Sequence, residues 1–151
     1  MCYGIHLWGH TARREEVFRK QKEAARVLAG ANINDHCRPI FRQLEILTMH
    51  STFVLSCLLW HRKNCNSMIS RGEVHPFATR HAQDVNAPRF RLSKNVKSFR
   101  YGSIKMYNAL PGIFKDKSLS NEAFKGRLKA WMITQSFYSI DEFFEACTVK
   151  I

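Results

Sequence analysis

Residues 49–63 read MHSTFVLSCLLWHRK, and this stretch decides the fold. Drawn as a helix, it carries apolar side chains on nearly every face until His61-Arg62-Lys63 at its end. A helix that is apolar all round is buried inside a protein. The stretch therefore predicts a central helix, packed on several sides by the rest of the chain. The uncharged run around it, residues 46–60, is shorter than the ~20 apolar residues that span a bilayer, so we expect no membrane partner.

Two further helices are predicted on the N-terminal side of this central stretch. Residues 13–29 have one apolar stripe and one basic face, with Thr11 available as the N-terminal cap and Gly30 as the stop signal. A shorter helix is predicted to start near residues 34–35, where a side-chain oxygen can cap it, with Pro39 in its first turn.

The C-terminal side is predicted to be helical as well. A brief helix over residues 103–109 precedes a Leu-Pro-Gly sequence, and residues 120–134 carry apolar side chains at helical spacing behind a capping serine, Ser120. Ser139 and Glu142 have the spacing of a capping box, which predicts that a last helix opens there.

Helical periodicity fades between residues 64 and 100, where glycine, proline, asparagine and serine recur. Residues 89–92 and 98–101 alternate polar with apolar side chains, which favours short extended pieces. The expected fold is therefore mainly α, a small helical bundle with an extended, irregular basic central segment. Its parts are an N-terminal helical part (1–64), the basic extended segment (65–101) and the C-terminal helices (102–151), all within one domain or lobe.

Charge is concentrated in the middle of the sequence. The 151 residues include 24 Lys and Arg against 12 Asp and Glu, a net charge of +12, and residues 61–115 hold 11 of the basic and 2 of the acidic side chains. Such a field favours polyanions, and interleaved aromatic rings can stack on unpaired bases. The alternatives are a solvated basic face and aromatic rings that only anchor the segment. The predicted nucleic-acid-binding residues are Arg62, Lys63, Arg71, Arg80, Arg89, Arg91, Lys94, Lys97, Arg100 and Lys105.

Motifs for catalysis or cofactor binding are not found in the sequence. The four aspartates, Asp35, Asp84, Asp116 and Asp141, are scattered, whereas two-metal catalysis needs carboxylates that converge on magnesium. Glycine-rich phosphate loops of the known kinds do not occur. We therefore predict no catalytic residue, no cofactor and no small-molecule substrate.

Five cysteines, with no Cys-x-x-Cys pair, indicate reduced thiols and an intracellular protein, nuclear or cytoplasmic. Cys57, His61 and Cys65 follow one another at intervals of four, which would place them on one helical face. Zinc ligation there is an alternative to a packed thiol and surface histidines, and we expect no metal. A second alternative is a thiol enzyme that uses Cys65 beside His61.

Nine short pieces, in the same order along the chain, carry a resemblance to a known family. They are YGIHLWG (3–9), QKEAARVLAG (21–30), CRP (37–39), LEILT (44–48), TR (79–80), RFRL (89–92), GSIKMYNALP (102–111), FKGRLK (124–129) and FYSIDEF (137–143). Together they resemble the region just after the polymerase core in jockey-like non-LTR retrotransposon reverse transcriptases of arthropods.

This resemblance implies a C-terminal, thumb-like segment that touches the template-primer backbone, RNA or DNA, beside a polymerase core. The family's Tyr-x-Asp-Asp catalytic box has no counterpart here, so we do not expect the chain to polymerise DNA by itself. Two alternatives remain. The chain is a protein-interaction module that packs on a polymerase core through the apolar helix around residues 53–60, or it is a non-functional transposon fragment.

Overall fold

A computed structural model describes residues 3–65, 68–74, 77, 79–89, 91, 98–116 and 118–148. This described part is mainly helical and has no β-strand, only an isolated antiparallel bridge between Ser70 and Val85. The predicted class, a mainly α helical bundle, is confirmed.

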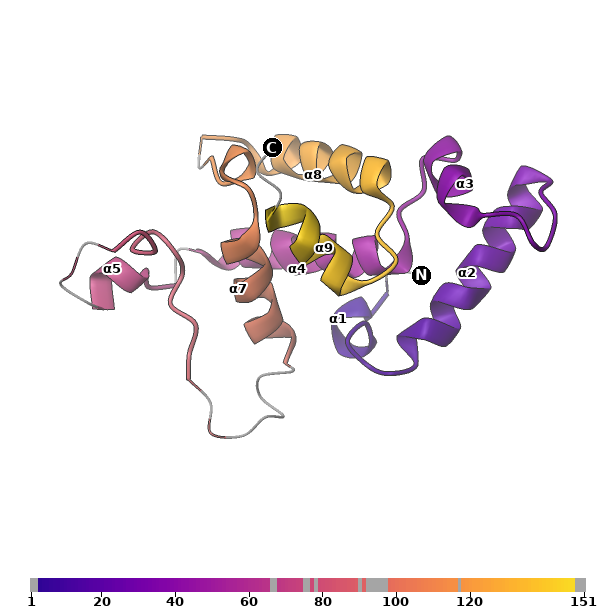
Figure 1. Ribbon diagram of the computed structural model, residues 1–151. Coiled ribbons are helices and arrows are strands. Elements are labelled where there is room, and N and C mark those ends of the chain that lie inside the picture. Colours follow the sequence, from indigo (N-terminus) through magenta and orange to yellow (C-terminus); the bar gives the residue numbers. More distant parts are fainter. Residues whose placement is uncertain are drawn as a thin grey trace.

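Helix α4, Met49–Asn64, is the predicted central helix and runs through the middle of the molecule (Figure 1). Its Phe53, Val54 and Leu58 side chains are at most 3% exposed. Helices from both ends of the sequence cover it, because its apolar surface faces several directions. The helices in contact with α4 in this main core are α1 (Ile5–Trp8), α7 (Phe99–Ala109), α8 (Asn121–Gln135) and α9 (Ile140–Thr148); a short 3-10 turn, η2 (Gly112–Phe114), packs on α8.

Helices α2 (Arg14–Ala29) and α3 (Cys37–Gln43) form a second, smaller core at one end of α4 (Figure 1). Phe18 of α2 and Phe41 of α3 are buried there, with their ring centroids 6.2 Å apart. Met49 belongs to this cluster and is also the first residue of α4. The first turn of α4 therefore joins the two cores.

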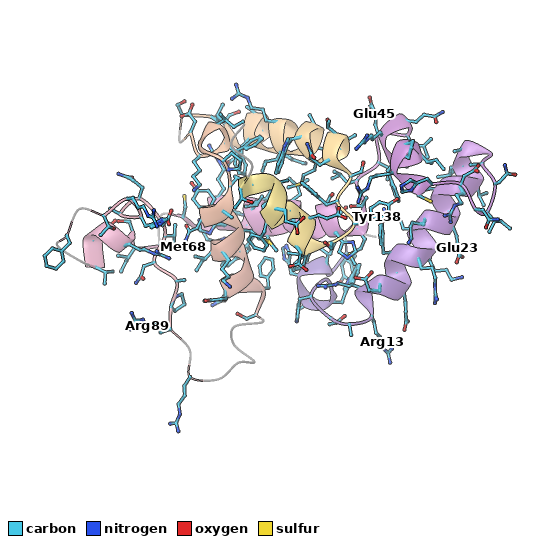
Figure 2. The ribbon with its side chains drawn as sticks, in the orientation of Figure 1. Arg13, Glu23, Glu45, Met68, Arg89 and Tyr138 are labelled. Carbon is cyan, nitrogen blue, oxygen red and sulfur yellow. The ribbon has the colours of Figure 1, made fainter. Side chains whose placement is uncertain are left out.

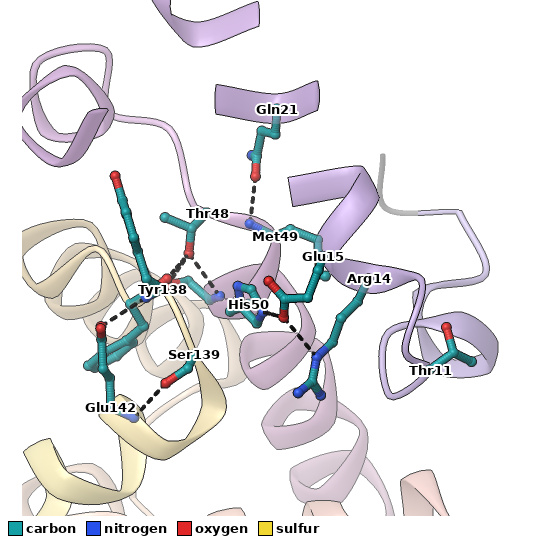
Figure 3. A network of polar contacts seen from close by, with 12 residues as sticks. Thr11, Arg14, Glu15, Gln21, Thr48, Met49, His50, Tyr138, Ser139 and Glu142 are labelled. Carbon is teal, nitrogen blue, oxygen red and sulfur yellow. Dashed lines mark hydrogen bonds and ion pairs between the residues drawn. The ribbon is translucent and has the colours of Figure 1, made fainter. Parts of the chain in front are cut away.

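Polar contacts fix this junction (Figure 3). The Gln21 side-chain amide donates to the Leu47 carbonyl oxygen at 2.8 Å and accepts from the Met49 backbone N–H at 2.7 Å. The start of α4 leaves backbone N–H groups without helical partners, so Gln21 satisfies one of them from α2.

Thr48 makes the second set of contacts at this junction (Figure 3). Its fully buried hydroxyl caps α4 by accepting from the Ser51 backbone N–H at 3.1 Å, and it donates to the Phe137 carbonyl oxygen at 2.6 Å. One hydroxyl thus caps the start of the central helix and ties it to the chain between α8 and α9.

The N-terminal helices differ from prediction at their starts. Helix α2 ends at Gly30, which has a left-handed φ of 64°, as predicted, but Thr11 does not cap it. The Thr11 hydroxyl instead donates to the Trp8 carbonyl oxygen at 2.7 Å, so it closes the turn after α1. Helix α3 starts later than residues 34–35, because the Asp35 carboxylate accepts from the Asn32 N–H within the preceding loop.

The predicted caps of the last two helices are confirmed. The Ser120 hydroxyl accepts from Ala123 N–H at 3.1 Å, and the Ser139 hydroxyl accepts from Glu142 N–H at 3.1 Å. The Glu142 carboxylate reaches back to the Tyr138 N–H at 2.9 Å, which completes the reciprocal pair one residue earlier than the standard box.

Residues 99–101 are helical and Ser98 is their N-terminal cap, so the prediction of an extended piece over 98–101 is wrong. Ser98 caps α7 by accepting from the Tyr101 N–H at 3.4 Å, and the helix starts four residues before the predicted 103. Tertiary packing explains the difference, because the Phe99 ring lies 5.3 Å from the Trp60 ring of α4 in an edge-on contact.

The basic segment is only partly extended. It contains the one-turn helix α5 (Arg71–Val74) and a set of turns before residue 85, and it projects from the side of the bundle (Figure 1). Arg71 N–H donates to the Asp84 carbonyl oxygen at 2.8 Å, which closes this piece into a small loop. Residues 90 and 92–97, which include part of the predicted 89–92 strand, lie outside the described residues.

Candidate nucleic-acid interface

Eight of the ten predicted binding cations lie within the described residues, and seven of these eight are exposed. Within the described part of the chain, none of these seven cations forms an ion pair with a carboxylate. The ion pairs that Lys and Arg make there are Arg14–Glu15, Lys20–Glu23 and Arg38–Glu142. The exposed cations are Lys63, Arg71, Arg80, Arg89, Arg91, Arg100 and Lys105. Lys94 and Lys97 lie outside the described residues.

Arg62 differs from the other seven because its guanidinium is hydrogen-bonded to groups at the start of α8. It donates to the carbonyl oxygens of Leu119 and Asp116 and to the Asn121 side chain. Its guanidinium carbon also lies 4.4 Å from the centroid of the Phe124 ring. These contacts bind the end of α4 to the start of α8, so the structure gives Arg62 a packing role.

The exposed cations come from three places in the fold. Lys63 lies in the last turn of α4, Arg100 and Lys105 lie on α7, and the other four lie along the segment between these helices. Figure 2 shows Arg89 on the stretch that joins α5 to α7, outside the helical body. Cations on an irregular surface segment keep their positive ends in water, where a phosphate can reach them.

The aromatic rings of the basic region have mixed positions. Phe77 is 76% exposed, whereas Phe99 packs on α4 and Tyr107 stacks on His61. Lys105 Nζ lies 5.5 Å from the centroid of Tyr101. Tyr107 belongs to α7 and packs on α4 through His61, and Phe90 lies outside the described residues.

A cavity of about 670 Å³ opens between the end of α4, the α5 region and α7. His61 and Tyr107 line it from the helical body, and Ser70, Glu73 and Gln83 line it from the basic segment. Small-molecule sites in proteins span ~300–1,000 Å³, so the cavity has the size of a ligand site.

His61 is the unusual residue of this cavity. Its side chain is fully buried, which corrects the prediction of a surface histidine, and neither ring nitrogen has a hydrogen-bond partner among the described residues. The ring stacks on Tyr107, with centroids 4.1 Å apart and an angle of 24° between planes. Burial lowers the pKa of His61 to about 4, so the imidazole is neutral at pH 7.

The predicted alternatives for Cys57, His61 and Cys65 have weak support. Cys57 is a fully buried core residue whose thiol pKa is raised by burial, and no group of three His, Cys, Asp or Glu among the described residues could hold a metal ion. Cys65 is exposed and lines the cavity with His61, but neither His61 nitrogen is hydrogen-bonded to it. His61 is therefore not placed to act as the base of a Cys65 thiol.

The apolar helix considered for packing on a polymerase core is already covered. Phe53, Leu58 and Cys57 are at most 3% exposed because α1, α7, α8 and α9 contact α4. Its apolar surface belongs to the core of this chain.

Sequence reasoning missed the cavity and the burial of His61. Residues 61, 70, 83 and 107 are far apart in sequence, and only the folding of the irregular segment against α4 and α7 brings them together. The position of His61 directly after the apolar stretch was the one signal available, and it did not distinguish a buried ring from an exposed one.

No protein-family model matches the chain, and no curated protein or solved structure matches it. Within the described ranges, none of the helices has both the length and the apolar character needed to cross a membrane.

Proposed function

We propose that this chain is a non-catalytic nucleic-acid-binding segment of a non-LTR retrotransposon reverse transcriptase. The observation that carries the binding proposal is the set of seven exposed cations that have no carboxylate partner among the described residues. The ordered resemblance of nine sequence pieces supports the assignment to this class of element.

Electrostatics favours a polyanion as the partner. A cation that pairs with no carboxylate of its own protein can replace counterions on a phosphate, and the released counterions drive binding. Residues 61–115 have a net charge of +9, so several phosphates can be neutralised together. Contacts of this kind do not read base sequence, so we expect binding without strong sequence preference.

The test compares two triple variants that remove the same charge. R71A/R89A/R91A removes three exposed cations of the basic segment, and K125A/R127A/K129A removes three exposed cations of α8. Both variants leave a net charge of +9, because each removes three of the +12 charges. Affinity for a short duplex and for a single strand is measured by fluorescence anisotropy at several salt concentrations.

The first variant is expected to weaken binding to the duplex and to lower the salt slope by about 2–3, since each lost phosphate contact removes ~0.9. The α8 variant is expected to change both quantities much less. Equal losses in the two variants would mean that binding follows net charge alone, and the basic segment would then not be the interface.

A further inference from the structure

The base of the basic segment is closed by the antiparallel bridge between Ser70 and Val85. One backbone hydrogen bond lies on each side of this bridge, from Asn86 N–H to the Ile69 carbonyl at 2.9 Å and from Arg71 N–H to the Asp84 carbonyl at 2.8 Å. In an antiparallel pair, a residue between two such bonds points its own N–H and carbonyl away from the partner strand. The backbone polar groups of Val85 therefore need partners outside the bridge.

Asn108 of α7 supplies both of these partners. Val85 N–H donates to Asn108 Oδ1 at 3.0 Å, and Asn108 Nδ2 donates to the Val85 carbonyl oxygen at 2.9 Å. A side-chain amide has the donor and the acceptor of a peptide group, so Asn108 pairs with Val85 as the backbone of a neighbouring strand would. Asn108 is itself held in place, because it lies in α7 and its carbonyl oxygen accepts from Lys115 Nζ at 2.7 Å. The two bonds thus join the basic segment to the helical body.

We infer that Asn108 is a positioning residue of the nucleic-acid-binding surface, which holds the cations of the basic segment and those of α7 in one fixed arrangement. Arg71 follows the bridge directly and Arg80 lies in the same closed piece, whereas Arg100 and Lys105 lie on α7, the helix that carries Asn108. Cations that are already held in place bind a phosphate backbone at a lower cost in conformational entropy than cations that binding must first order. The inference rests on the function proposed above and adds an uncharged residue to it.

The test is a double-mutant cycle on the full chain, with a short DNA duplex as the ligand. N108A is made in the wild type and in R71A/R80A, and affinity is measured by fluorescence anisotropy at several salt concentrations. In the wild type, N108A leaves the net charge unchanged, yet it is expected to weaken binding about tenfold and to lower the salt slope by about 1–2, since two cations are no longer held in place. In R71A/R80A it is expected to have no effect, because the cations that it positions are gone.

N34A is the matched control, because it removes the same side-chain amide at an exposed position between α2 and α3. It is expected to bind the duplex as the wild type does. N108L has nearly the shape of asparagine without its polar atoms, and it is expected to repeat the result of N108A. Hydrogen exchange followed by NMR reads the contact directly. The Val85 N–H is expected to exchange faster in both Asn108 variants, while the Leu58 N–H in α4 keeps its protection.

The outcomes separate this inference from the proposed function. If R71A/R80A weakens binding but N108A and N108L bind as the wild type does, Asn108 has no positioning role and the phosphate-binding surface remains. If N108A weakens binding equally in both backgrounds, its effect does not pass through Arg71 and Arg80, and the inference is overturned. Wild-type affinity in R71A/R80A also overturns it, because these two cations then lie outside the interface. If the wild type does not bind the duplex, both proposals are overturned.

Discussion

At the scale of single residues, the buried His61 side chain lowers the stability of the fold. Each buried ring nitrogen that lacks a partner costs about 1–3 kcal/mol, because it has lost its hydrogen bond to water. Phenylalanine would fill the same flat space against Tyr107 without polar atoms to satisfy, so we expect H61F to be at least as stable as the wild type at pH 7. Residues that weaken a fold in this way are commonly retained for function.

The first prediction concerns the pH dependence of stability. The unfolded chain binds a proton at His61 near pH 6.5, whereas the folded chain binds it only near pH 4, since burial lowers the pKa. Between these values the unfolded state holds more protons, so stability falls as the pH falls. The wild type should lose about 2–3 kcal/mol more than H61F between pH 7 and pH 4. Urea denaturation at several pH values measures this difference, and parallel curves for the two proteins would contradict it.

At the scale of the elements, much of the fold could be predicted from the sequence. Helices α2, α4 and α8 were predicted within one or two residues, because their apolar spacing is local information. The error at Phe99 occurs because a contact with a residue distant in sequence, Trp60, decides the structure there. The error at Thr11 is local, because the turn just before α2 uses its hydroxyl. Caps with a nearby donor, such as Ser120, were predictable for the same local reason.

The second prediction compares two helix caps. T48A removes the cap of α4 and also leaves the buried Phe137 carbonyl without its donor, for a combined loss of about 2–4 kcal/mol. S120A removes only a cap, at an exposed position, and should cost about 1 kcal/mol. Urea denaturation of both variants gives the comparison, with T48S as the control that keeps the hydroxyl. Equal losses in T48A and S120A would show that the bond to Phe137 contributes nothing.

At the scale of the whole molecule, the candidate interface was only partly predictable. A charge count locates the basic segment, and the selected cations that lie within the described residues are exposed except for Arg62. The count could not show that Arg62 holds α4 to α8, because the carbonyl groups that it contacts are more than 50 residues away. Composition gives the sign of the surface charge, whereas the fold determines which cations remain available to bind a phosphate.

The third prediction concerns the salt dependence of binding. If about six of the seven exposed cations reach phosphates, the slope of log K against log salt on a duplex should be near −5. The same contacts on a single strand should give a slope near −4, because a single strand holds fewer condensed counterions. Titrations at several salt concentrations measure both slopes. An affinity that does not change between low and moderate salt would contradict the electrostatic proposal.

The central position of α4 also has a consequence for biosynthesis. A ribosome makes α4 before α7, α8 and α9, the helices that cover much of its apolar surface. Until those later helices emerge, the nascent chain presents this surface to solvent, and such exposure promotes aggregation and recruits chaperones. Translation that stalls soon after α4 should therefore yield an aggregation-prone, protease-sensitive product.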